Sequence, residues 1–178
     1  MRWDRRLGDL FDDLEQQAEG LALAERDAEV AEQSRAEYAR VDLAARLHAS
    51  VGARLLVTVT GVGPVDGLLR RVGEDWCLLE VGEREWIIRT SAAGSLRGLA
   101  DRAVPEPLRP VTARLGWASA MRGAAAGRGE VVLHRRDGTQ ARGALVRVGA
   151  DFVELLGEDE PGHPAVVPLA AVVAVRSG

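Results

Sequence analysis

Residues 65–80 read Val-Asp-Gly-Leu-Leu-Arg-Arg-Val-Gly-Glu-Asp-Trp-Cys-Leu-Leu-Glu, and residues 141–156 read Ala-Arg-Gly-Ala-Leu-Val-Arg-Val-Gly-Ala-Asp-Phe-Val-Glu-Leu-Leu. At a constant offset of 76 residues, seven positions are identical, and Trp76 falls on Phe152. The identical pairs are Gly67/Gly143, Leu69/Leu145, Arg71/Arg147, Val72/Val148, Gly73/Gly149, Asp75/Asp151 and Leu79/Leu155. This agreement predicts an internal duplication, in which one structural unit occurs twice along the chain.

Apolar and polar residues alternate through both copies, which is typical of half-buried β-strands. The dipeptide Asp137-Gly138 is a strong signal for a two-residue hairpin, and Gly61-Val-Gly-Pro64 is a looser form of it. We therefore expect five short strands in each copy, over residues 52–99 and 128–178. His134, next to two arginines, is expected on a solvated strand face.

The first fifty residues have a helical pattern. Proline is absent from Trp3 to about His48, and we expect one long helix over this range. Its apolar stripe recurs at steps of three and four residues and consists of Trp3, Leu7, Leu10, Phe11, Leu14, Ala18 and Leu21. Such a stripe is too apolar to remain in water, so we expect self-association through it. Packing back onto the same chain is the alternative.

Between the two copies, Val104–Pro110 contains three prolines and predicts a stiff linker, and Ala113–Ala126 predicts a short helix. The expected fold class is α+β, with a long N-terminal helix followed by two five-stranded β-barrels, the second preceded by a short helix. The expected segments are an association helix (1–51), a first barrel (52–99), a proline-rich linker with a short helix (100–127) and a second barrel (128–178).

This layout of a helix followed by five short strands resembles the Sm-like family of small SH3-type barrels, which includes the RNA chaperone Hfq. The second copy, Leu133 to Leu156, carries the resemblance best. The resemblance implies base-stacking aromatics at Trp76 and Phe152 and a binding arginine at Arg89. The family's base-reading asparagine is replaced by Leu78 and Glu154. The layout is also similar to uncharacterised helix-plus-barrel proteins of high-GC bacteria.

The charge distribution gives weak support to a nucleic-acid partner. The net charge is −4, all 23 basic residues are arginine, and only residues 51–128 are basic, with 11 arginines against 8 acidic residues. A mildly basic segment permits nucleic-acid binding but does not require it. An RNA- or DNA-binding regulatory protein is therefore the alternative function, and its candidate contacts are Trp76, Arg89, Arg70, Arg71, Arg135 and Arg136.

No catalytic or metal-binding motif stands out. The three histidines are scattered, and no dinucleotide fingerprint or nucleophile elbow occurs. The single cysteine, Cys77, is expected to be buried in a protein of a reducing compartment. The longest apolar run, Ala165–Val175, is too short to span a membrane. We expect a cytoplasmic, non-enzymatic interaction or scaffold module without cofactor or metal, whose partner the sequence does not identify.

Overall fold

The computed structural model describes residue 26, residues 29–157 and residues 162–178. The chain divides into two compact units, residues 1–41 and 42–178. The apolar stripe from Trp3 to Leu21 lies outside the described residues. Association through this stripe therefore stays a prediction.

The expected continuous helix from Trp3 to about His48 is wrong. Among the described residues, a helix covers 29–38, residues 39–42 are not helical, and a second helix, α2, covers Leu43–Ala49. The N-terminal helical region therefore consists of separate pieces where the structure describes it.

Asp42 is the physical reason for this break. Its backbone is extended, with φ −85° and ψ 161°, and its carboxylate accepts a hydrogen bond from the Ala45 N–H at the start of α2. Aspartate at such a position satisfies a free N–H group and favours a new helix start over a continuing helix. The same carboxylate pairs with the Arg109 guanidinium at 2.8 Å.

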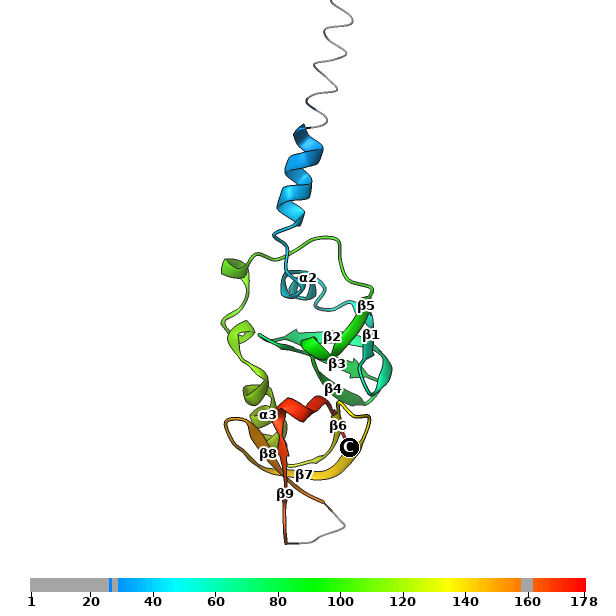
Figure 1. Cartoon of the computed structure of the whole chain (residues 1–178), viewed down its shortest axis with the longest axis vertical. Coiled ribbons are helices and arrows are strands. Elements are labelled where there is room, and N and C mark those ends of the chain that lie inside the picture. Colours follow the sequence, from blue (N-terminus) through cyan, green and yellow to red (C-terminus); the bar gives the residue numbers. More distant parts are fainter. Residues whose placement is uncertain (1–25, 27–28, 158–161) are drawn as a thin grey trace, which may run out of the picture. The chain divides into compact units, whose positions relative to one another are not determined.

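The described part of residues 42–178 forms one antiparallel sheet of ten strands, in the order β5-β1-β2-β3-β4-β10-β6-β7-β8-β9 (Figure 1). The first five strands are β1 (Arg54–Val59), β2 (Gly63–Val72), β3 (Trp76–Val81), β4 (Arg84–Arg89) and β5 (Ala93–Arg97). The others are β6 (Glu130–Arg135), β7 (Gln140–Val148), β8 (Phe152–Leu156), β9 (Ala165–Pro168) and β10 (Val172–Ser177). The expected fold class, with two separate five-stranded barrels behind a long helix, is therefore wrong.

Strands β4 and β10 join what had been expected as two barrels. We call their contact the junction, and its register pairs are Trp86/Arg176, Ile87/Val175 and Ile88/Ala174. A strand at the edge of a sheet has unpaired N–H and C=O groups that readily pair with another strand. Pairing within the chain satisfies these groups on β4 and β10 and makes the sheet continuous.

The two hydrophobic cores also share residues across the junction. Val173 and Ala174 belong to β10 but pack in the first core, beside Leu55 and Leu79. In the other direction, Trp76 belongs to β3 but packs in the second core, next to Trp117. Because each core needs side chains from the other half, the halves cannot be independent barrels.

Within this common sheet, the strands of the two halves pair alike. Leu69 pairs with Leu79 in the first half, and Leu145 pairs with Leu155 in the second. All four side chains are buried. The residues matched at the offset of 76 therefore occupy corresponding register positions.

Two helices cover the sheet. Leu47 of α2 is fully buried in the first core, and Met121 of α3 (Trp117–Ala126) is fully buried in the second. The helix expected over Ala113–Ala126 begins later, because its first part is a 3₁₀ turn. The 3₁₀ turns are η1 (Thr90–Ala92), η2 (Glu106–Leu108), η3 (Val111–Arg114) and η4 (Leu169–Ala171).

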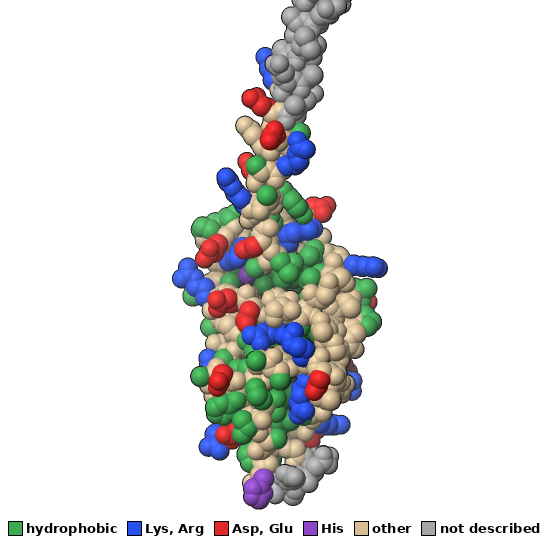
Figure 2. All heavy atoms as spheres, in the orientation of Figure 1, with side chains coloured by type: hydrophobic (Ala, Val, Ile, Leu, Met, Phe, Trp, Pro, Cys, Tyr) green, Lys and Arg blue, Asp and Glu red, His purple; other side chains and the backbone are tan. Residues whose placement is uncertain are grey.

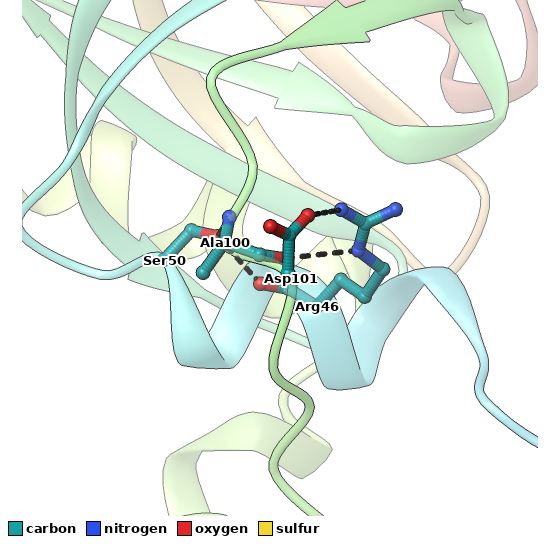
Figure 3. Close-up of polar contacts among 4 residues, drawn as sticks. All are labelled: Arg46, Ser50, Ala100 and Asp101. Carbon is teal, nitrogen blue, oxygen red and sulfur yellow. Dashed lines mark hydrogen bonds and ion pairs between the residues drawn. The ribbon is translucent and has the colours of Figure 1, made fainter. Parts of the chain in front are cut away.

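Polar contacts fix α2 to the segment that follows β5 (Figure 3). The Arg46 Nε–H donates to the Ala100 carbonyl at 3.0 Å, and the Ala100 N–H donates to Ser50 Oγ at 2.9 Å. Arg46 also lies 3.6 Å from the Asp101 carboxylate. Because Arg46 of α2 and its capping residue Ser50 bind the C=O and the N–H of Ala100, α2 has a defined position over the first core.

Two further expectations concern burial and membranes. Cys77 is 1% exposed, so the prediction of a buried cysteine is confirmed, and burial raises the pKa of its thiol to about 12. In the described part of the chain, no helix has the length and apolar character needed to cross a membrane.

Candidate functional site

Trp76, the expected base-stacking aromatic, does not present an open ring. Its side chain is only 9% exposed, and its indole N–H donates to the Leu115 carbonyl at 2.7 Å. Its counterpart Phe152 is partly buried. Stacking on a base requires an accessible ring face, so the Trp76 position fits a packing role better than base recognition.

Two of the candidate arginines are held by acidic residues. The Arg70 guanidinium donates to Glu80 at 2.8 Å, and this hydrogen bond lowers the pKa of Glu80. Arg89 lies 3.7 Å from Asp75, and its guanidinium carbon is 5.9 Å from the ring centre of Trp117. These contacts hold both guanidinium groups against neighbouring side chains of the same protein.

The remaining candidates are spread over the sheet. Arg135 donates to Thr139 at 3.4 Å and Arg136 is exposed, both at the end of β6, whereas Arg71 is exposed on β2. Arginine and acidic side chains are interspersed on the face that Figure 2 displays. The structure therefore does not bring the six predicted residues together into one site.

Two strands, β5 and β9, form the open edges of the sheet. Among the residues that the structure describes, each pairs with one neighbour, β5 with β1 and β9 with β8. Val166 on β9 is 63% exposed. Its counterpart on β4, Ile87, is partly buried and packs against the second core. The β9 edge thus exposes an apolar side chain whose counterpart beside the junction is partly buried.

A polar cluster crosses the junction, with one residue from each of three adjacent strands. His134 of β6 stacks on Trp86 of β4 at 4.9 Å between ring centres, and the guanidinium carbon of Arg176 of β10 lies 5.8 Å from the same tryptophan ring. His134 is 5% exposed and its Nε2 has no partner among the described residues. The expectation that His134 is solvated is therefore wrong. Burial and the nearby Arg176 charge lower the pKa of His134.

A hollow of about 530 Å³ lies between α3 and the sheet, and we call it the α3 hollow. Its floor includes Leu78 and Ile87, which pair across β3 and β4. Its helix side includes Ala120 and Gly123, and Arg71 stands among its polar lining residues. The size falls within the range of about 300–1,000 Å³ that is usual for small-molecule pockets.

Sequence reasoning did not identify the open edges, the junction cluster or the α3 hollow. Each depends on strands or helices that are distant in the chain: His134 and Trp86 meet only because β10 lies between their strands. For the α3 hollow, the sequence repeat does contain a signal at one position. The repeat places Leu78 where the second copy has Glu154, which indicates that this spot on the sheet is apolar in the first half alone.

Comparisons with known protein families and curated proteins found no match, so the function is inferred from the fold and the site. No family model matches the chain. No curated protein matches it either. The relationship to the Sm-like family stays a prediction. Within residues 26, 29–157 and 162–178, no group of three or more histidine, cysteine or acidic side chains is arranged to hold a metal ion.

Proposed function

We propose that the protein is a non-enzymatic interaction module that assembles with further copies of itself along the open edges of its sheet. The junction between β4 and β10 is the observation that carries this proposal. In the repeated layout, β9 occupies the position of β4, and β5 occupies the position of β10. The two open edges are therefore the counterparts of two strands that already pair within the chain.

The register of such an intermolecular pairing follows from the junction. Strands β4 and β9 each lead into a 3₁₀ turn and then into the last strand of their half, at an offset of 79 residues. Transferred at this offset, the junction pairs become Val167 with Ser95, Val166 with Leu96, and Ala165 with Arg97 of a second copy. Strand pairing of this kind satisfies the free backbone groups of both edges.

Pro168 does not prevent this pairing. Proline lacks an N–H group and interrupts edge-to-edge hydrogen bonding. At the offset of 79, however, Pro168 corresponds to Arg89, which lies outside the register pairs of the junction. The pairing needs Ala165, Val166 and Val167, all of which precede the proline in β9.

Sedimentation of the full-length protein tests the proposal. We expect concentration-dependent association in the wild type and a mass close to that of the monomer for Val166→Lys, because a lysine on an edge strand opposes pairing. Val146→Lys is the matched control: Val146 is also exposed, at 46%, but lies on the interior strand β7. Unchanged association of Val166→Lys would overturn the edge proposal and leave the N-terminal stripe as the remaining candidate surface.

Nucleic-acid binding is the second candidate function, and the described contacts favour it less. Trp76 is covered, and Arg70 and Arg89 are engaged by acidic residues. Binding that depends on phosphate contacts falls steeply as salt rises. We expect no saturable binding in the sub-micromolar range when single-stranded and duplex oligonucleotides are titrated by fluorescence anisotropy at physiological salt. Tight binding that Arg89→Ala abolishes would make nucleic-acid recognition the function.

A further inference from the structure

We propose that the α3 hollow binds a small organic carboxylate with an apolar body, and that Arg71 holds the carboxylate group. This site lies apart from the open strands β5 and β9. It would therefore add small-molecule recognition to a module whose assembly depends on other residues.

The floor of the hollow supplies an apolar surface that crosses several strands. Leu78 on β3 pairs with Ile87 on β4, and Ile87 pairs with Val175 on β10 across the junction. All three line the hollow, and so does Trp76. A ligand must therefore have an apolar body, because burial against this floor releases water from apolar surface.

The helix side of the hollow leaves open space. Gly123 of α3 lines it, and a Cβ atom added there would have no heavy atom within 4 Å. Ala120 and Ala124, one turn of helix apart on α3, line the same side. Small residues at these positions keep the helix from filling the hollow with its own side chains.

Arg71 is the evidence for a carboxylate. The repeat matches it with Arg147, whose Nε–H donates to Glu154 at 2.7 Å from the paired strand. Arg71 pairs across the strands with Leu78 instead of a glutamate, and among the described residues no carboxylate lies within ion-pair distance of it. The first half therefore has an arginine at the hollow without the acidic partner that the second half provides.

The acidic residues of the hollow limit where the carboxylate can lie. Glu130 is already engaged by Arg142 at 2.9 Å. Glu85, two residues from Ile87 along β4, lines the hollow as well. Like charges repel, so the ligand's charge must lie toward β2, near Arg71. A guanidinium can bind a carboxylate through two parallel hydrogen bonds.

Titration with three octyl compounds tests the charge preference. We would add octanoate, octanol or octylammonium to the full-length protein and follow the tryptophan indole N–H signals by NMR, with the Trp76 signal assigned from Trp76→Phe. We expect octanoate to bind at least about tenfold more tightly than octanol, as a charge-assisted hydrogen bond permits, and octylammonium to bind most weakly. Equal affinities for the three compounds would overturn the proposal.

Two variants locate the binding group. Arg71→Gln should reduce octanoate affinity to that of octanol, whereas Arg147→Gln, the matched control in the second half, should leave it unchanged. An equal effect of both variants would show that general surface charge, and not Arg71, attracts the carboxylate.

A third variant tests the hollow itself. Gly123→Leu places a side chain in the open space on α3 and replaces a poor helix former by a good one. The variant should fold, retain the edge-dependent association, and lose octanoate binding. Retained octanoate binding in a folded Gly123→Leu protein would place the ligand elsewhere and overturn the assignment.

Discussion

Residues 54–97 and 130–177 form the two halves of one sheet, and their backbones are more alike than their surroundings. A register shift follows Leu69 in β2 and recurs after Leu145 in β7. The Gly73 N–H donates to the carbonyl of Trp76, and the Gly149 N–H donates to the carbonyl of Phe152. Backbone pairing is thus common to both halves, and the differences arise where other elements cover them.

The aromatic position illustrates the difference. Gly73 and Gly149 lie directly against the rings of Trp76 and Phe152, where a Cβ atom would collide with the ring. Beyond this shared contact, Trp76 reaches the carbonyl of Leu115, whereas a phenylalanine has no donor for such a bond. Trp76 therefore connects its half to the linker, whereas Phe152 contributes packing without a hydrogen bond.

The largest expected effect comes from the two cores. Leu79→Ala and Leu155→Ala should each lower the free energy of unfolding by about 2–5 kcal/mol, because both leucines are buried and truncation leaves a cavity. Urea denaturation followed by tryptophan fluorescence measures the change. Because the cores share residues, each variant should unfold in a single transition. Two separated transitions in Leu155→Ala would mean that the halves are independent after all.

A smaller effect is expected at the aromatic position. Trp76→Phe removes the hydrogen bond to Leu115 and should cost about 0.5–1.5 kcal/mol for that bond, in addition to lost packing. Trp117→Phe is the matched control, because the buried indole nitrogen of Trp117 has no partner among the described residues. Thermal and urea unfolding of both variants gives the comparison. A cost for Trp117→Phe equal to that of Trp76→Phe would remove the hydrogen bond as the explanation.

The pH dependence of stability should differ between the halves. His134 corresponds to Thr58 in the first half, so only the second half has a titrating group at this position. The lowered pKa means that the unfolded chain takes up a proton more readily than the folded protein. Stability should therefore be full above the ordinary histidine pKa of 6.5 and fall as the pH drops below it. Urea unfolding across this pH range should show a shallower slope for His134→Phe. The remaining slope comes from His48, whose pKa burial and Arg109 also lower, and at lower pH from carboxyl groups of lowered pKa such as Asp137. An unchanged slope would exclude His134 as the source.

The smallest effect is expected at the position where Arg147 pairs with Glu154 in the second half and Arg71 lies opposite Leu78 in the first. Glu154→Gln removes the partner of Arg147; the arginine side chain is 74% exposed and the glutamate side chain is 14% exposed. Because the guanidinium remains largely in water, the loss should stay within about 0.2–1 kcal/mol and diminish in high salt. Unfolding experiments at low and high salt measure it. A loss that salt does not reduce would point to packing of Glu154 instead of its charge.

The repeat predicts much of the strand pairing, because identical residues such as Leu69 and Leu145 sit at positions where only buried apolar side chains fit. The junction is different. Alternating residues in β4 look the same in sequence whether the edge faces water or another strand, so Trp86–Ile88 contains no sign of pairing with β10. The prediction of two separate barrels was wrong because it did not include the pairing of β4 with β10.

The candidate site was less predictable for a related reason. Trp76 has the residue type of a stacking platform, but what covers it lies 39 residues further along the chain. Similarly, two arginines beside His134 indicate an exposed strand, whereas the position of β6 between β10 and β7 buries the histidine. Exposure is a property of the assembled sheet and cannot be inferred from neighbouring residues.

The exchange of core residues between the halves has a consequence for protein synthesis. Val173 and Ala174 complete the first core but are translated about a hundred residues after β1 and β2. Until β10 has left the ribosome, the first half lacks these side chains and its β4 edge is unpaired. Contacts between residues so far apart in sequence slow folding, and an open edge invites pairing with a neighbouring nascent chain. Strand β10 is thus made well after the first half that it closes, and chains translated side by side can exchange it.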